Sequence, residues 1–284
     1  MKPLSDYIPI DKSLAIRVLC LDILNKTSPF TTHKKLSDDI QHAVVAASTW
    51  HNKKDIVVGE AGTLLRFLRY IAWHTNVEKK FILHGTLLSR KVGDTAIIYN
   101  LDIPQLLKLD GNTSQWACAA YLCGKRGLPD KIPFKLQQTV SIVEDYPSLH
   151  FSWFNQLDKT IESQAKAYLV HKNENLFSKW SPIHSEDFCF ARVFNFITSA
   201  EGENRWPQLR NHESDRISEI ELGIYDLENT GEIASKDHRV VQAIVLYALS
   251  KGIKYNCRYP DAVNKSWPQF WDFCLEMQQR GICA

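Results

Sequence analysis

The sequence predicts an α/β fold, because short strands alternate with helices along most of the chain. Several of the helices open on a small, hydroxylated or acidic residue that can act as an N-cap. The composition, with 44% apolar and 23% charged residues among 284, is typical of a soluble globular protein with one large core or two ordinary ones.

In the N-terminal half, apolar residues recur at helical spacing after Asp11, on one face that includes Leu14, Val18 and Leu21. A short predicted strand at residues 55–58 leads into a glycine-containing turn, and a further helix follows that turn. The predicted helices of this half begin at Asp11, at residues 37–39, after the turn at residues 59–62, and at Ser114. The predicted strands are residues 55–58, 80–83 and 96–99.

In the C-terminal half, helices are predicted after Glu213, after Asp237 and near the end of the chain, where apolar residues again recur at helical spacing. Residues 124–180 are the least periodic part, with three prolines and a polar segment at residues 173–179. Because such stretches connect structural units, we expect a domain connection near the end of this region.

Charge and cysteine usage narrow the function classes. A net charge of +2 is too small to indicate a nucleic-acid groove or an anionic membrane surface, and no apolar run approaches a membrane span. Seven scattered cysteines and ten histidines show neither disulfide pairing nor metal-ligand spacing. The first 24 residues lack the features of a signal peptide. We therefore expect no metal, no nucleic-acid partner and no membrane partner, and a cytoplasmic location.

Five short phrases open probable helices with small, hydroxylated or cationic residues. A helix N-terminus exposes unpaired N–H groups and the positive end of the helix dipole, so it attracts anions. The phrases begin at Asp11, Gly59, Asp110, Arg210 and Asp237. Several such helix starts carrying Lys or Arg indicate chemistry on phosphorylated or carboxylated metabolites.

In this order and with this content, the phrases resemble those of the 5-enolpyruvylshikimate-3-phosphate synthase family, over about residues 8–115 and 209–265. The resemblance implies two domains built as inside-out α/β barrels of repeated βαβ-type units, with helix N-termini facing a shared cleft. This chain is shorter than the family pattern, so the second domain is expected to be truncated. The implied domains are residues 10–165, and residues 1–9 together with 166–284.

The resemblance also implies a reaction: phosphoenolpyruvate is joined to the 5-hydroxyl of shikimate 3-phosphate and phosphate is released, with no metal or organic cofactor. Lys12 would contact both substrates, and Glu213 with a carboxylate at Asp187 or Glu186 would complete the catalytic set. The implied substrate-binding residues are Ser13, Arg17, Gly62, Arg66, Arg90, Thr113, Ser114, Gln115, Tyr146, Arg216, Arg239 and Lys265.

These residue types suit that chemistry. A lysine among cations has a lowered pKa and can act as an acid, a carboxylate can act as a base, and arginines orient phosphate and carboxylate groups. The chain departs from the family pattern at three sites. Glu60 replaces an asparagine, so we expect Arg66 or Arg90 to neutralise it; His212 replaces a lysine, and Val143 stands where the pattern has a serine.

Other interpretations remain open at the level of sequence. The acceptor substrate could be a different anionic alcohol, because the residues expected to bind the acceptor match the family pattern less well than those expected to bind phosphoenolpyruvate. The chain could also be a shortened homologue that binds an anion or a partner without catalysis. For single residues, Arg17 and Arg66 could be solvated surface arginines, Ser13 and Ser114 plain N-caps, and Asp187 and Tyr146 structural residues.

Overall fold

The computed structural model describes residues 2–89, 96–109, 114–211 and 215–283. The chain divides into two compact units, which we call the N-terminal unit (Ile10–Gln156) and the C-terminal unit (Leu157–Ala284 with Met1–Pro9). The sequence analysis placed the change of domain at residues 165/166. That position lies inside helix α9 (Lys159–Leu169), whose N-cap Asp158 accepts a hydrogen bond from the Ile161 backbone.

The predicted inside-out α/β barrel is wrong. Helices hold 61% of the structure, and the described residues contain only two small parallel sheets of two strands each, with no closed barrel. Strand β1 (Asp55–Gly59) pairs with β2 (Lys80–Leu83), and β3 (Glu232–Ile233) pairs with β4 (Asn256–Cys257). A barrel requires each strand to pair on both edges, and these strands of two to five residues each pair on one edge only.

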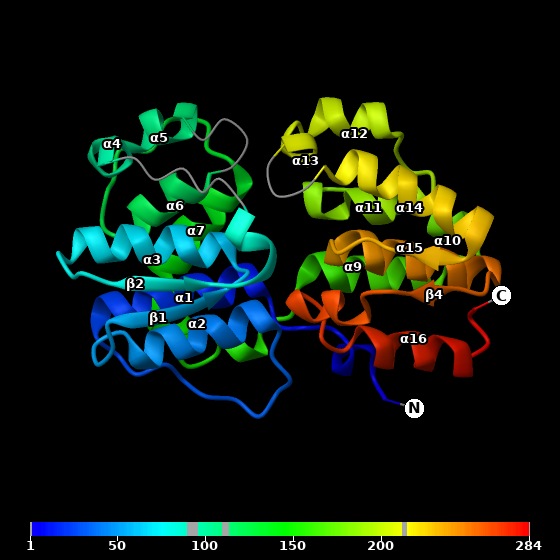
Figure 1. Cartoon of the computed structure of the whole chain (residues 1–284), viewed down its shortest axis with the longest axis horizontal. Coiled ribbons are helices and arrows are strands. Elements are labelled where there is room, and N and C mark those ends of the chain that lie inside the picture. The colour runs from blue at the N-terminus through cyan, green and yellow to red at the C-terminus, as the bar shows by residue number, and fades with distance from the viewer. Residues whose placement is uncertain (1, 90–95, 110–113, 212–214, 284) are drawn as a thin grey trace. The chain divides into compact units, whose positions relative to one another are not determined.

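One predicted strand is itself helical. Residues 96–99 belong to helix α4 (Ala96–Asn100), in which Ile98 is buried and Ile97 is exposed. A run of four apolar residues does not distinguish a strand from a helix by periodicity, so tertiary packing decided between them. The other two predicted strands are confirmed as β1 and β2, which lie side by side in Figure 1.

The N-terminal unit is built around α1 (Lys12–Asn25), which packs on five neighbouring α-helices of the described residues. The predicted N-cap is confirmed, because the Asp11 side chain accepts a hydrogen bond from the Leu14 backbone at 2.9 Å. The sheet of this unit is a single strand–helix–strand motif, with α3 between β1 and β2 in the chain. The further helices are α2 (Asp38–Thr49), α3 (Gly62–His74), α5 (Ile103–Leu109), α6 (Gln115–Leu122), α7 (Phe134–Glu144) and α8 (Tyr146–Leu149), with 3-10 turns at Gly85–Ser89 and Trp153–Asn155.

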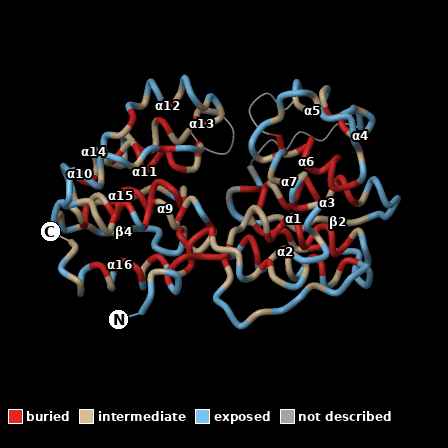
Figure 2. Tube along the Cα trace, turned by 180° about the vertical axis from the view of Figure 1, so that it is seen from behind, coloured by how far each residue is buried: buried red, intermediate tan, exposed pale blue. Residues whose placement is uncertain are grey.

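The C-terminal unit is built around α15 (His238–Lys251), which is buried along almost its whole length and is mostly red in Figure 2. Its N-cap is Asp237, after which the sequence predicts a helix, and its C-cap is Gly252. The other elements are α9, α10 (Glu174–Phe177), α11 (Phe188–Val193), α12 (Ser199–Arg205), α13 (Gln208–Asn211), α14 (Arg216–Thr230) and α16 (Phe270–Gln279), with 3-10 turns at Leu4–Asp6, Ser185–Asp187 and Pro260–Lys265.

Residues 124–180, the least periodic part of the sequence, contain helices α7 to α10. Two of the three prolines there start helices: Pro133 is the N-cap of α7, and Pro147 lies in the first turn of α8. Proline is well suited to a first helical turn, because the N–H that it lacks has no partner there. Within the described ranges, no helix combines the length and the apolar character that a membrane span requires.

Candidate functional site

Arg17 is the centre of the candidate site in the N-terminal unit. It lies on α1 with 2% of its surface exposed, so the solvated-surface interpretation is wrong. Its Nε donates to the Thr139 hydroxyl at 2.7 Å, its Nη1 donates to the hydroxyl and carbonyl of Ser13, and its guanidinium covers the Phe67 ring at 5.2 Å. These partners are all neutral, so the guanidinium is hydrogen-bonded but its positive charge is not offset by a carboxylate contact.

The same guanidinium connects α1 to the start of α6. Its Nη2 lies 3.6 Å from the sulfur of Cys118, whose thiol in turn lies 3.7 Å from the Ser114 hydroxyl. One residue further on, the Gln115 side-chain oxygen accepts a hydrogen bond from Arg66 Nη1 at 2.5 Å. Arg66 is 8% exposed, so it is not a surface arginine either. We call the connected predicted residues the N-terminal cluster: Ser13, Arg17, Arg66, Ser114 and Gln115.

The two serines of this cluster are not plain N-caps. Ser13 lies inside α1, which Asp11 caps, and its hydroxyl donates to Gln138 and accepts from Arg17. Ser114 occupies the N-cap position of α6, but its side chain makes no capping hydrogen bond. Helix α3 begins at Gly62 after Ala61, which has no side-chain acceptor with which to cap it. Two helix starts of this unit therefore keep first-turn N–H groups that no N-cap side chain occupies.

Lys12 and Glu60 lie close to protein groups of their own unit. The Lys12 ammonium is 2.9 Å from Asp39 Oδ2, and the lysine side chain keeps 23% of its surface exposed. The Glu60 carboxylate lies directly against Gly85, where an added Cβ would come within 1.7 Å of Oε1. The expectation that Arg66 or Arg90 neutralises Glu60 stays a prediction, because Arg90 lies outside the described residues.

Tyr146 has a structural set of contacts. Its hydroxyl donates to Asp22 Oδ1 at 2.7 Å, and the His150 ring nitrogen Nδ1 lies 2.7 Å from the same oxygen. Burial raises the pKa of Tyr146 to about 12 and also raises the pKa of Asp22. These contacts connect α8 to α1, so Tyr146 is engaged within the unit and does not contact the N-terminal cluster through them.

In the C-terminal unit, charged residues gather at the start of α15. Asp237 caps this helix by accepting from the Arg239 backbone at 2.8 Å, and its other oxygen accepts from Arg216 Nε at 2.9 Å. The Arg239 side chain, 5% exposed, donates through Nη2 to Glu186 Oε2 at 3.1 Å. Its Nη1 is buried and has no hydrogen-bond partner among the residues that the structure describes. We call Glu186, Arg216, Asp237 and Arg239 the C-terminal cluster.

A second carboxylate stands beside this cluster. Glu219, on α14, accepts from the Ser235 hydroxyl at 2.6 Å, and Ser235 also accepts from the Asp237 backbone. Burial raises the pKa of Glu219, and the negative charge of Asp237 raises it further.

Asp187 and Glu186 are neighbours with different surroundings. The Asp187 carboxylate is buried and accepts from the backbones of Ile183 and His184 and from the Gln164 side chain, at 3.0, 3.1 and 2.8 Å. It therefore shapes its own turn, as the structural interpretation predicts. Glu186 is partly exposed and contacts Arg239, which makes it the carboxylate of the two that lies at the candidate site.

The remaining predicted residues divide into one that is placed and three that are not. Lys265 ends the 3-10 turn at Pro260–Lys265, which packs against α15, and the next residue, Ser266, accepts from Gln242 of that helix at 3.1 Å. Arg90, Thr113 and Glu213 lie outside the described residues. Gln242, buried three positions after Arg239, was missed by the sequence analysis; its only signal was the single polar residue in an otherwise apolar helical run.

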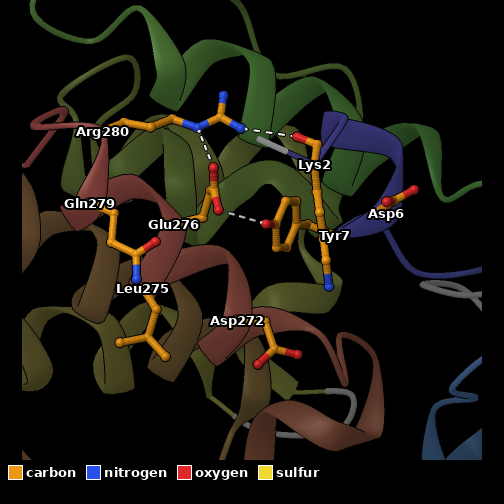
Figure 3. Close-up of a pocket in the computed structure, with 8 residues that line it drawn as sticks. All are labelled: Lys2, Asp6, Tyr7, Asp272, Leu275, Glu276, Gln279 and Arg280. Carbon is orange, nitrogen blue, oxygen red and sulfur yellow. Dashed lines mark hydrogen bonds and ion pairs between the residues drawn. The ribbon is translucent and has the colours of Figure 1, made fainter.

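A hollow of about 660 Å³ lies elsewhere in the C-terminal unit, between the first residues of the chain and α16 (Figure 3). Arg280 donates to Glu276 and to the Lys2 carbonyl there, and the Tyr7 hydroxyl donates to Glu276. None of the predicted site residues lines it, and two of its charged side chains, Arg280 and Glu276, form an ion pair at 2.8 Å. Across the part of the chain that the structure describes, no group of three or more His, Cys, Asp or Glu residues could hold a metal ion.

Comparison with known proteins adds no family to this geometry: no family model matches the chain, and neither a curated protein nor a solved structure matches it.

Proposed function

We propose that this protein transfers the enolpyruvyl group of phosphoenolpyruvate to the 5-hydroxyl of shikimate 3-phosphate and releases phosphate. The observation that carries the proposal is the buried Nη1 of Arg239, at the start of a 14-residue helix. This cationic donor has no hydrogen-bond partner in the described part of the chain. An unsatisfied buried donor costs about 1–3 kcal/mol, more for a charged group, and an anion that accepts from it removes that cost. A phosphate or carboxylate ligand supplies such an acceptor.

The N-terminal cluster supports the same proposal from the other unit. Arg17 retains its charge among neutral partners, and Arg66 lies beside the starts of α3 and α6, which no N-cap side chain occupies. A cation beside helix N-termini favours a dianionic ligand. Each unit thus carries its own anion-binding residues, as a reaction between two acidic metabolites requires.

The proposed chemistry is an addition followed by an elimination. The 5-hydroxyl oxygen bonds to C2 of phosphoenolpyruvate while a proton is added to the methylene carbon and the hydroxyl proton passes to a carboxylate. Phosphate then leaves C2 as the new methyl group loses a proton, which restores the double bond. Glu186 is the proposed base, because it is the partly exposed carboxylate of the C-terminal cluster.

The test is phosphate release from phosphoenolpyruvate by the purified full chain, with and without shikimate 3-phosphate. We expect release that depends on the acceptor and falls by about tenfold or more in Arg239→Gln, since a hydrogen bond to a charged group contributes about 1.5–3 kcal/mol. Arg258→Gln is the matched control, because Arg258 is an exposed arginine that also pairs with a carboxylate. If the parent protein releases no phosphate, either with or without shikimate 3-phosphate, the proposal is contradicted.

A second candidate function, anion binding without catalysis, is favoured by one observation. Lys12, Arg216 and Arg239 each contact a carboxylate of the protein, which reduces the net positive charge available to a substrate. Under this alternative, phosphate and phosphoenolpyruvate bind in calorimetry but no phosphate is released. Release that occurs only with another anionic alcohol would instead identify a different acceptor.

A further inference from the structure

Two buried polar atoms on α15 lack hydrogen-bond partners within the described ranges and lie on the same side of the helix. The first is Arg239 Nη1, a donor. The second is Gln242 Oε1, an acceptor, in a side chain that is 3% exposed. Residues three apart on a helix are neighbours on its surface, so these two side chains lie next to each other.

The Gln242 amide is held at its other end. Its Nε2 donates to the Ser266 hydroxyl at 3.1 Å, which directs the unsatisfied oxygen away from Ser266. Because hydroxyl groups both donate and accept, the opposite amide orientation would also satisfy Ser266 and would leave an N–H group unsatisfied instead. Whether the second unsatisfied atom is the amide oxygen or the amide nitrogen can therefore be tested by comparing ligands that can and cannot donate a hydrogen bond to it.

We infer that Arg239 and Gln242 form a subsite for a phosphate group that carries a proton. This inference rests on the anion site of the proposed function and specifies which anion that site takes. One phosphate oxygen accepts from Arg239 Nη1, and the P–OH group donates to Gln242 Oε1. Inorganic phosphate retains a hydroxyl at neutral pH, whereas sulfate has the same shape and no proton to donate.

The charged neighbours agree with a protonated anion. Glu186 accepts from Arg239 Nη2, and Asp237 caps the same helix while pairing with Arg216, so two carboxylates stand beside the subsite. Carboxylates repel a fully ionised anion and tolerate, or accept from, one that carries a P–OH group. The subsite accordingly suits inorganic phosphate, which is the product that the proposed reaction releases.

The experiment is calorimetric titration of the full chain at pH 7 with sodium phosphate and, separately, with sodium sulfate. We expect phosphate to bind about tenfold more tightly than sulfate. Phosphate can donate a hydrogen bond to Gln242 Oε1, whereas sulfate leaves that oxygen without a donor. In Gln242→Met, which replaces the amide with an apolar side chain of similar size, phosphate binding should weaken to the level of sulfate. Arg258→Gln is the control, because it removes an exposed arginine whose partner is Glu232 and leaves Arg239, Gln242 and the Gln242–Ser266 hydrogen bond in place.

The outcomes separate the two proposals. Equal binding of phosphate and sulfate by the parent, with both lost in Arg239→Gln, would overturn the protonated-phosphate subsite and keep the anion site. An unchanged phosphate preference in Gln242→Met, with the variant's thermal unfolding midpoint within a few degrees of the parent's, would also overturn it. Binding of neither anion by the parent would remove the anion site on which the inference depends.

Discussion

The two units present arginines to a candidate anion in opposite ways. In the N-terminal cluster, Arg17 is surrounded by the hydroxyls of Ser13 and Thr139, a backbone carbonyl and an aromatic ring. In the C-terminal cluster, Arg216 and Arg239 each contact a carboxylate. The hydrogen bonds of a buried guanidinium can thus go to neutral groups or to a carboxylate. Neutral groups leave the positive charge without a nearby negative charge, whereas a carboxylate offsets it. An arginine with neutral partners attracts an anion more strongly. An arginine that is paired with a carboxylate must either lose that contact when an anion binds or bind the anion beside the carboxylate.

The largest expected effect comes from removing the neutral-partner arginine. Arg17→Met leaves the Ser13 and Thr139 hydroxyls and a backbone carbonyl without their charged donor in a buried position. We expect the free energy of unfolding to fall by about 3 kcal/mol, measured by urea denaturation. The exposed Arg258→Met should change it by less than about 0.5 kcal/mol. Similar losses in both variants would mean that the network around Arg17 does not stabilise the unit.

The second-largest effect concerns the packing of Gly85 against Glu60 in the N-terminal unit. Gly85 has a φ of +50° and no room for a Cβ beside Glu60, so Gly85→Ala should destabilise the protein by about 2 kcal/mol. Gly127→Ala is the matched control, since Gly127 has a φ of +85° with open space around it and so isolates the backbone strain. Adding Glu60→Ala to Gly85→Ala should recover the part that exceeds the control. If it recovers nothing, the contact with Glu60 is not the cause.

A binding experiment sharpens the comparison between the clusters. Glu186→Gln removes the carboxylate from Arg239 and leaves a neutral group, which brings the C-terminal cluster closer to the situation of Arg17. We expect phosphate affinity to rise by roughly tenfold in calorimetry, because one repulsive charge beside the anion is lost. Glu232→Gln, which removes the partner of the exposed Arg258, should leave the affinity unchanged. An unchanged affinity in Glu186→Gln would show that Glu186 does not compete with the anion.

The smallest effect is a pH dependence from Glu219. Burial raises its pKa in the folded state, so the folded protein binds this proton more tightly than the unfolded chain does. Its stabilising contribution is complete below the ordinary glutamate pKa and is lost as the pH rises through the raised value. Denaturation at a series of pH values from 4 to 8 should show a steeper decline for the parent than for Glu219→Gln. Parallel curves would contradict the raised pKa.

Local sequence signals predicted part of the helix starts. Asp11 and Asp237 cap α1 and α15, and the apolar stretch before the Gly59 turn is β1. These features depend on groups within a few residues of one another, such as Asp11 Oδ1 and the Leu14 N–H. The sequence also identified Arg17, Arg66, Gln115 and Arg239 as candidate residues, although it did not show which groups each would contact.

The tertiary structure decided the architecture and the surroundings of each candidate. Residues 96–99 became a helix and the predicted barrel gave way to two helical units, because short apolar runs follow the packing that surrounds them. Arg17 is buried against Thr139, and Tyr146 donates to Asp22, across more than a hundred residues of chain in each case. By itself, the sequence determined several helix starts, such as those capped by Asp11 and Asp237, and the cations that lie near them, since those interactions are local. Whether a carboxylate offsets the charge of each cation depends on distant segments that only the folded chain brings together.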